Sequence, residues 1–343
     1  MTIASPKRIP APSLATAFDQ GPVDSLTTID PPTGEVMARL AAHVVADPLT
    51  QPDRFCMEAR DASFEVPASV RRPVLAFAAR GSTTGILVLQ GLQVGPVPAT
   101  PLDNAGGLAS RTVLARQMAI IANIVSEMVA YEAEGHGHLL QDMSPNPRLV
   151  MAQQSQGSGE PLEAHTEQAH SLYRPDYVFL GCLRGDPAAK TYTYSARKLI
   201  ERLNADEVAL LRRPMWTTTI DESFRPLVPD PDEVRGPFAI LSGPTHDPSM
   251  LVDQDLMHGI TAASHQLLRK VIDLYETHRD EHVLARGEVL VLDNHRAMHG
   301  RSAFRAAFDG SDRFIARGFG VRDRRRLLPV MLSDRRTVAA RHS

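Results

Sequence analysis

Three side chains that suit the same kind of metal ion constrain the fold of this chain most strongly. His165 and Glu167 are two residues apart, and His299 follows 134 residues after His165. Positions i and i+2 of a β-strand point to the same face, so on a strand both side chains would reach one ion. Two imidazoles and one carboxylate form the facial triad of non-haem iron oxygenases. If the three residues meet at one ion, residues 165–299 belong to a single core.

The spacing of apolar residues changes from a helical to a strand-like pattern along the chain. Helical spacing predicts a helix over 118–129, which Gly135 is placed to end, and another amphipathic helix over 267–275. Asn204, three residues before Glu207, predicts a capping-box start for a further helix. Continuous apolar runs predict strands at 74–77, 288–293 and 313–319. Helices come first and a strand-rich half follows, which indicates an α+β fold around a β core.

The charge balance excludes some classes of partner. The chain has 37 basic and 40 acidic residues, which give a formal net charge of −3. Proteins that bind nucleic acids or anionic membranes need a surplus of basic residues. The chain has neither a signal-peptide pattern nor an apolar run of about 18 residues. Two cysteines cannot form a disulfide framework. We therefore expect a cytoplasmic enzyme or binding protein without nucleic-acid or membrane partners; a homo-oligomer stays open.

Two arginines stand at a spacing that indicates carboxylate binding. Arg313 comes fourteen residues after His299, and Arg317 follows four residues later in the same strand-like run. Residues four apart on a strand share a face, so both guanidinium groups would enter one pocket. A guanidinium group binds carboxylates in a bidentate manner. With 13 histidines in the chain, a His-x-Glu pair also arises by chance. The spacing of the two arginines after His299 therefore gives the metal hypothesis support that the pair alone does not.

Several separated segments carry a pattern that is more specific than the triad. They are 131–138, 163–178, 182–187, 214–219, 252–256, 299–302 and 309–313. These segments resemble the clavaminate synthase-like branch of the Fe(II)/2-oxoglutarate dioxygenases. Within that branch they are most similar to bacterial hydroxylases of free basic amino acids, especially L-lysine hydroxylases. The resemblance spans roughly residues 115–325.

The resemblance implies a double-stranded β-helix, the jelly-roll or cupin-like fold, with flanking helices and a lid or insert. We expect one dioxygenase domain over residues 1–343, beginning with a flexible arm at 1–25. Residues 26–140 would be mainly helical support. Residues 141–325 would form the β-helix core, with an insert at 225–285.

The resemblance also implies a set of ligands. His165, Glu167 and His299 would hold Fe(II), while Arg313 and Thr193 would bind 2-oxoglutarate. O₂ would take the position that remains, and ascorbate would serve as reductant in vitro. The products would be a hydroxylated amino acid, succinate and CO₂.

The expected substrate is a free basic L-amino acid, hydroxylated at C3 or C4. Arg317 suits its carboxylate, and Gln141 and Ser155 match family positions that bind the substrate backbone. Asp253 and Asp255 would receive a cationic head group; read by themselves, they are two solvated loop acids. L-Lysine is the first choice, and L-arginine, L-citrulline and L-ornithine are the alternatives.

Other patterns compete with this hypothesis. His278, Glu281 and His282 fit a His-x-x-Glu-His zinc metallohydrolase motif, although a solvated helix end is the better interpretation of this polar stretch. His295 could replace His299 as the distal ligand. His136 and His138 either line the substrate pocket or close a helix. A non-catalytic amino-acid sensor is the third reading of the chain.

Overall fold

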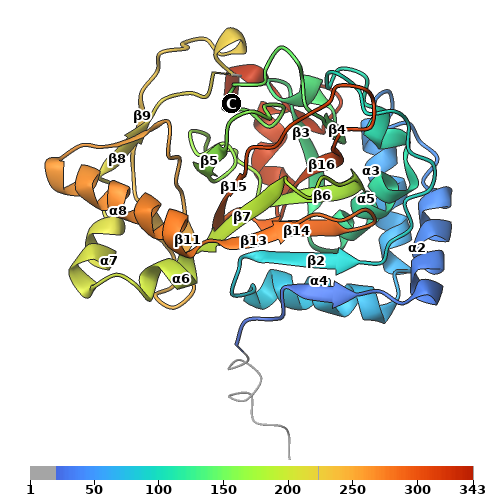
Figure 1. Cartoon of the computed structure of the whole chain (residues 1–343), viewed down its shortest axis with the longest axis horizontal. Coiled ribbons are helices and arrows are strands. Elements are labelled where there is room, and N and C mark those ends of the chain that lie inside the picture. The colour runs from blue at the N-terminus through green and yellow to red at the C-terminus, as the bar shows by residue number, and fades with distance from the viewer. Residues whose placement is uncertain (1–20, 223, 343) are drawn as a thin grey trace, which may run out of the picture.

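The computed structural model describes residues 21–222 and 224–342, so most of the expected arm at 1–25 lies outside the described residues. The described chain is a mixed α+β structure with sheets of eight, four, three and two strands (Figure 1). This architecture confirms the α+β class that the change in apolar spacing predicts.

The eight-stranded sheet joins strands from both ends of the chain. β1 pairs with β2 and β17 with β3 in parallel, and the remaining pairs are antiparallel. Two members confirm the strands predicted at 288–293 and 313–319. In spatial order the strands are β1 (Leu26–Thr28), β2 (Ile86–Gln90), β14 (Val289–Asp293), β6 (Tyr177–Arg184), β16 (Phe314–Val321), β3 (Glu127–Tyr131) and β17 (Thr337–Val338), with β4 (Gln141–Met143) also paired to β16.

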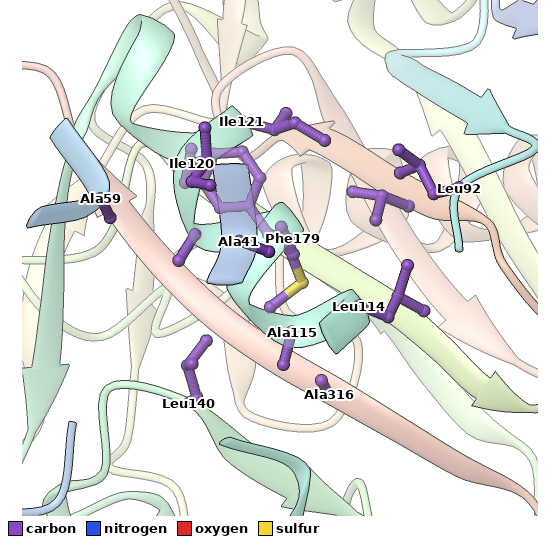
Figure 2. Close-up of a cluster of buried hydrophobic side chains, with 14 of the residues drawn as sticks. Ala41, Ala59, Leu92, Leu114, Ala115, Ile120, Ile121, Leu140, Phe179 and Ala316 are labelled. Carbon is purple, nitrogen blue, oxygen red and sulfur yellow. The ribbon is translucent and has the colours of Figure 1, made fainter. Parts of the chain in front are cut away.

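Helices from the N-terminal part pack on one face of this sheet. α5 lies against β6 and also contacts α2, α3 and α4. Figure 2 shows side chains of α5, among them Leu114 and Ile120, packed with Phe179 of β6. Burying these apolar side chains is the main favourable term for docking the helices. The four helices are α2 (Pro31–His43), α3 (Pro52–Phe64), α4 (Ala68–Arg80) and α5 (Val113–Val125).

Two elements predicted from apolar spacing differ in the structure. The run 74–77 lies inside α4 and is not a strand, because a short apolar run fits a buried helix face as well as a strand. The helix predicted over 118–129 ends at Val125, and the chain continues as β3. Val129 is the register partner of Phe319 in β16. Pairing with a strand nearly 200 residues away thus overrides the local helical spacing.

The four-stranded sheet provides the second wall of a cavity that the large sheet also lines. Val178, Leu180 and Leu292 of the large sheet line one side of this cavity, and Thr191 and His299 of the smaller sheet line another. Side chains alternate between faces along a strand, so β6 sends Phe179 to the helices and its neighbours to the cavity. The smaller sheet has the order β13 (Asp280–Val283), β7 (Lys190–Ser195), β15 (Ala297–Arg301) and β5 (Leu162–His165).

A third group of elements lies at the left of Figure 1. It packs around the chain's single tryptophan. Trp216 is fully buried there and donates a hydrogen bond to the carbonyl of Ser264. Asn204 and Glu207 form the predicted capping box at the start of α7. The elements are α6 (Ala196–Ile200), α7 (Ala205–Leu211), β8 (Trp216–Thr218), β9 (Arg235–Phe238), β10 (Leu241–Ser242), β11 (Ser249–Met250), β12 (Met257–Gly259) and α8 (Ala262–His278).

Short 3-10 helices complete the described chain. They are η1 (Leu108–Arg111), η2 (Gly135–Gly137), η3 (Arg225–Leu227), η4 (Arg324–Val330) and η5 (Ala340–His342). Among the helices of residues 21–222 and 224–342, none combines the length and the apolar character needed to cross a bilayer.

Candidate active site

The cavity between the two sheets has a volume of about 180 Å³ and contains most of the residues expected at a site. Its lining includes His165, Glu167, His299, Arg313, Arg317, Ser155, Asp253 and Asp255. Gln141 and Thr193 are absent from the lining. The fold therefore brings together eight of the ten residues singled out from the sequence and places the other two outside the cavity surface.

The two histidines of the triad face each other across paired strands. His165 ends β5, and His299 lies opposite it in β15, with ring centroids 4.3 Å apart. Glu167 follows in a turn and not on the strand, so the predicted i, i+2 strand geometry is wrong. Its Oε1 nevertheless lies 4.0 Å from His165 Nε2 and 3.5 Å from His299 Nε2. In the described chain this is the one group of three or more histidine, cysteine or acidic residues arranged to hold a metal ion.

The chemistry of these donors fits a divalent transition metal. His165 Nδ1 lies 2.8 Å from the carbonyl of Glu163, which fixes the ring and leaves Nε2 for the cavity. Burial opposes ionisation of Glu167, but Arg317 and the two imidazoles outweigh it and lower the pKa of Glu167 to about 2. Burial also lowers the pKa of His299. An ionised carboxylate and neutral imidazoles are the forms that bind a metal.

Two further residues hold the triad in place. The Glu167 N–H donates to Asn294 Oδ1 over 2.8 Å, and Asn294 Nδ2 donates back to the Glu167 carbonyl over 3.1 Å. Gly300 lets β5 approach β15, since a Cβ at this position would lie 2.6 Å from the Leu162 carbonyl oxygen. Neither residue has a sequence signal of its own apart from the adjacency of Gly300 to His299.

The other histidines considered from the sequence lie elsewhere. His295 Nε2 is 2.7 Å from Asp176 Oδ1, and its Nδ1 accepts a hydrogen bond from Arg174 over 2.8 Å. Its two ring nitrogens are thus engaged outside the cavity, and the structure favours His299 as the distal ligand. His136 and His138 do not line the cavity either.

The zinc-hydrolase motif is not assembled. His278 is exposed at the last residue of α8, so the motif does not share one helix face. Glu281 lies in β13 and pairs with Lys190 at 2.7 Å. His282 pairs with Glu288 at 2.8 Å. These separate surface pairs contradict the motif hypothesis.

One end of the cavity carries two buried arginines that form no ion pair within residues 21–222 and 224–342. Arg313 is 5% exposed, and Arg301 is 4% exposed. Burial, together with the nearby charge of Arg313, lowers the pKa of Arg301 to about 9. A buried charge needs a counter-charge, so this end suits an anionic ligand. Thr191 lines the cavity here, and Thr193, the expected helper of Arg313, does not; Thr193 is instead the register partner of His299.

Arg317 is already engaged in the structure. Its Nε and Nη2 donate to Gln141 Oε1 over 2.9 and 2.6 Å, which explains the place of Gln141 behind the cavity wall. It also forms an ion pair with Glu134, and Glu167 lies 3.6 Å away. Glu134 lines the cavity and accepts a hydrogen bond from Gln168. Sequence reasoning missed Glu134, although it lies in the recognised segment 131–138.

Acidic side chains gather in another part of the cavity lining. The Asp255 N–H donates a hydrogen bond to Asp253 Oδ1 over 3.1 Å. Asp253 itself forms an isolated antiparallel bridge with His165, and the turn follows it. Burial raises the pKa of Asp253 to about 6. Asp221, which sequence reasoning missed, adds a third carboxylate. Three carboxylates in one lining favour a cationic ligand.

Comparison with known proteins gives consistent matches. The family model described as "Taurine catabolism dioxygenase TauD, TfdA family" matches residues 48–319. An L-lysine 3-hydroxylase of Catenulispora acidiphila is 44% identical over 333 residues, which cover 95% of this chain and 92% of the relative. Clavaminate synthase 2 of Streptomyces clavuligerus is 28% identical and covers 85% of this chain and 91% of its own length. A solved asparagine oxygenase in complex with Fe(II), 2S,3S-3-hydroxyasparagine and succinate has a TM-score of 0.85 at 28% identity, covering 92% of this chain and 99% of that one.

Proposed function

The chain belongs to the TauD, TfdA family of dioxygenases, and on this premise we propose that it hydroxylates free L-lysine. It is an oxygenase that uses Fe(II), 2-oxoglutarate and O₂, and it acts on an amino acid. The 44% identity to an L-lysine 3-hydroxylase over nearly the whole chain supports lysine as substrate and C3, in preference to C4, as the carbon hydroxylated. We further infer that the two facing sheets form a double-stranded β-helix in a single domain.

The segregation of charge in the cavity is the observation that carries this proposal. Arg301 and Arg313 lie at the end without acidic partners, whereas Asp221, Asp253 and Asp255 provide carboxylates elsewhere in the lining. A dianionic cosubstrate and a substrate with a cationic side chain need these opposite surroundings. A neutral amino acid would bring no counter-charge to Asp253, whose ionisation burial opposes.

In this proposal His165, Glu167 and His299 hold the iron, and Arg313 binds the distal carboxylate of 2-oxoglutarate. Iron, 2-oxoglutarate and O₂ together supply the oxidant that removes a hydrogen atom from an unactivated C–H, and 2-oxoglutarate leaves as succinate and CO₂. The chain's own task is to hold the target carbon in place and to exclude water. The apolar side chains of Val178, Leu180 and Leu292 serve the second purpose.

A zwitterionic substrate backbone would replace an ion pair that already exists in the cavity. Arg317 would receive the α-carboxylate, and Glu134 would receive the α-ammonium group, so the Arg317–Glu134 pair acts as a template for the free amino acid. Gln141 would keep Arg317 oriented. Ser155, which lines the cavity, would contact the substrate backbone, and Asp253 and Asp255 would bind the side-chain ammonium group.

A panel of free amino acids tests the proposal. Purified enzyme with Fe(II), ascorbate and 2-oxoglutarate is given lysine, arginine, ornithine, citrulline and asparagine separately, and products are read by mass spectrometry together with succinate. We expect a lysine product heavier by one oxygen, with succinate formed in equal amount. Turnover of arginine, ornithine or citrulline in preference to lysine would keep the reaction and change the substrate. Absence of turnover with every basic amino acid would overturn the proposal.

A further inference from the structure

Arg301 links the strand of His299 to the segment around Ser155, and the function proposed above assigns it no individual contact with a ligand. It lies on β15 two residues after His299, so both side chains point to the cavity face of this strand. Its Nη1 donates to the carbonyl of Ser155 over 2.9 Å, and its Nη2 donates to the carbonyl of Gly157 over 2.6 Å. One guanidinium group therefore ties the strand of a triad histidine to the segment that carries Ser155.

The segment tied by Arg301 forms part of the cavity wall but has no helix or strand of its own. Gln153, Gln154, Ser155 and Gln156 all line the cavity, within turns and bends. Local bonds also hold it: the Asn146 N–H donates to the Gln156 carbonyl, and the Ser158 N–H donates to the Val150 carbonyl. Gln153 Nε2 donates to the Pro161 carbonyl, and the Glu163 N–H donates to Gln153 Oε1. From β15 and the residues after it, Arg301 and a bond from the Phe304 N–H to the Ser158 carbonyl hold the segment. A wall that lacks a strand ladder depends on such side-chain hydrogen bonds for its position.

The charge of Arg301 is uncompensated in the described structure. Its side-chain hydrogen bonds go to backbone carbonyls, and the buried guanidinium group of Arg313 lines the same cavity. Two buried cations at one end of a cavity repel each other. A dianion bound at Arg313 would relieve that repulsion and would favour the arrangement in which both guanidinium groups stay in place.

We propose that Arg301 is a positioning residue that couples binding of 2-oxoglutarate to ordering of residues 153–158, the wall that contacts the amino acid. The coupling rests on the proposed function for its two ligands. Cosubstrate bound at Arg313 would fix the wall through Arg301, and the amino acid would bind the ordered wall with higher affinity. Such coupling is reciprocal, so the amino acid raises the affinity for 2-oxoglutarate by the same factor.

Hydrogen exchange of the metal-loaded protein without O₂ tests the first half without any amino acid. We expect 2-oxoglutarate to slow amide exchange of residues 153–158 at least fivefold in the wild-type protein and less than twofold in Arg301→Lys. Lysine keeps the charge and loses the planar fork that reaches two carbonyls. Arg212→Lys is the matched control, since Arg212 also donates to two consecutive carbonyls, those of Gly243 and Pro244, at an exposed site.

Calorimetry under the same conditions tests the second half. In the wild type and in Arg212→Lys, 2-oxoglutarate should tighten lysine binding about tenfold, and in Arg301→Lys the factor should fall below threefold. In a separate assay with O₂, Arg301→Lys should form succinate in excess over hydroxylated product. Arg301→Gln, which removes the charge, should abolish the effect. Unchanged coupling in Arg301→Lys, or an equal loss in Arg212→Lys, would overturn the proposal. The exchange experiment needs no amino acid, so its result is valid even if lysine is not the substrate. If 2-oxoglutarate does not slow exchange of residues 153–158 in the wild type, the coupling is refuted and the proposed function is not.

Discussion

His165 and His299 are register partners on neighbouring antiparallel strands, and their imidazole centroids are 4.3 Å apart. The pairing of β5 with β15 thus converts a separation of 134 residues in the sequence into one donor group. Gly300 makes the pairing close enough, because a Cβ there would meet both Leu162 and Tyr275. Strand pairing therefore brings the two imidazoles together, and Glu167 joins them from the turn after β5.

Removing a triad histidine should abolish the reaction. His165→Ala leaves one imidazole and one carboxylate, so we expect iron affinity to fall and O₂-dependent succinate formation to drop by more than about 100-fold. Exposed His278 serves as the control, and His278→Ala should keep full activity. If activity is lost in His278→Ala and kept in His165→Ala, the zinc-hydrolase hypothesis replaces the present one.

Substitution of Arg313, just before β16, and of Arg317, within β16, should raise the KM values of two different ligands. Arg313→Lys loses a bidentate fork, worth about 1.5–3 kcal/mol, so its KM for 2-oxoglutarate should rise about 10- to 100-fold. Arg317→Lys should raise the KM for the amino acid by a similar factor while the KM for 2-oxoglutarate changes less. Steady-state kinetics with one ligand saturating measures both. Identical effects of the two variants on both constants would contradict the assignment.

Glu134→Gln should weaken recognition of the free α-ammonium group. The amide keeps the shape and loses the charge, so the KM for lysine should rise about tenfold or more, with the KM for 2-oxoglutarate nearly unchanged. The wild type should reject Nα-acetyl-lysine, and the variant should discriminate less between the two. Exposed Glu132, two residues earlier, gives the control Glu132→Gln. A variant that retains the wild-type preference for free lysine would rule out this role.

Burial of His170 should make the protein less stable in mild acid. The ring is 2% exposed, packs edge-on against Phe224 at 4.9 Å, and burial lowers the pKa of His170 to about 4. Below about pH 6.5 the unfolded chain gains a proton that the folded chain refuses until about pH 4. Stability is therefore lost as the pH falls through this range, by about 2 kcal/mol at pH 5.

Urea unfolding of the metal-free protein at pH 7 and pH 5 measures this loss. His170→Phe preserves an aromatic ring against Phe224 and removes the titrating group, so its loss of stability between the two pH values should be smaller by about 2 kcal/mol. His246→Phe, at an exposed position, is the control. An equal pH dependence in the wild type and His170→Phe would show that His170 does not carry the effect.

Local pattern was a sound guide where an element is decided by its own residues. The capping box at Asn204 and Glu207 satisfies backbone groups within one helical turn, and it forms as predicted. The α8 helix and strand β14 also agree with their apolar spacing. The helix predicted to reach residue 129 ends earlier, because β3 gains more from pairing with β16 than from continuing a helical stripe.

The sequence alone determined which chemical groups are present and which of them are spaced for a common purpose. His165, Glu167, His299, Arg313 and Arg317 could be named in advance, because their residue types and spacing match a family pattern. Only the tertiary structure decided which side chains complete the cavity. Glu134 pairs with Arg317, and Arg301 reaches the wall around Ser155, through contacts between residues far apart in the chain. Such contacts depend on sheet pairing and on packing across two layers, and no local spacing encodes them.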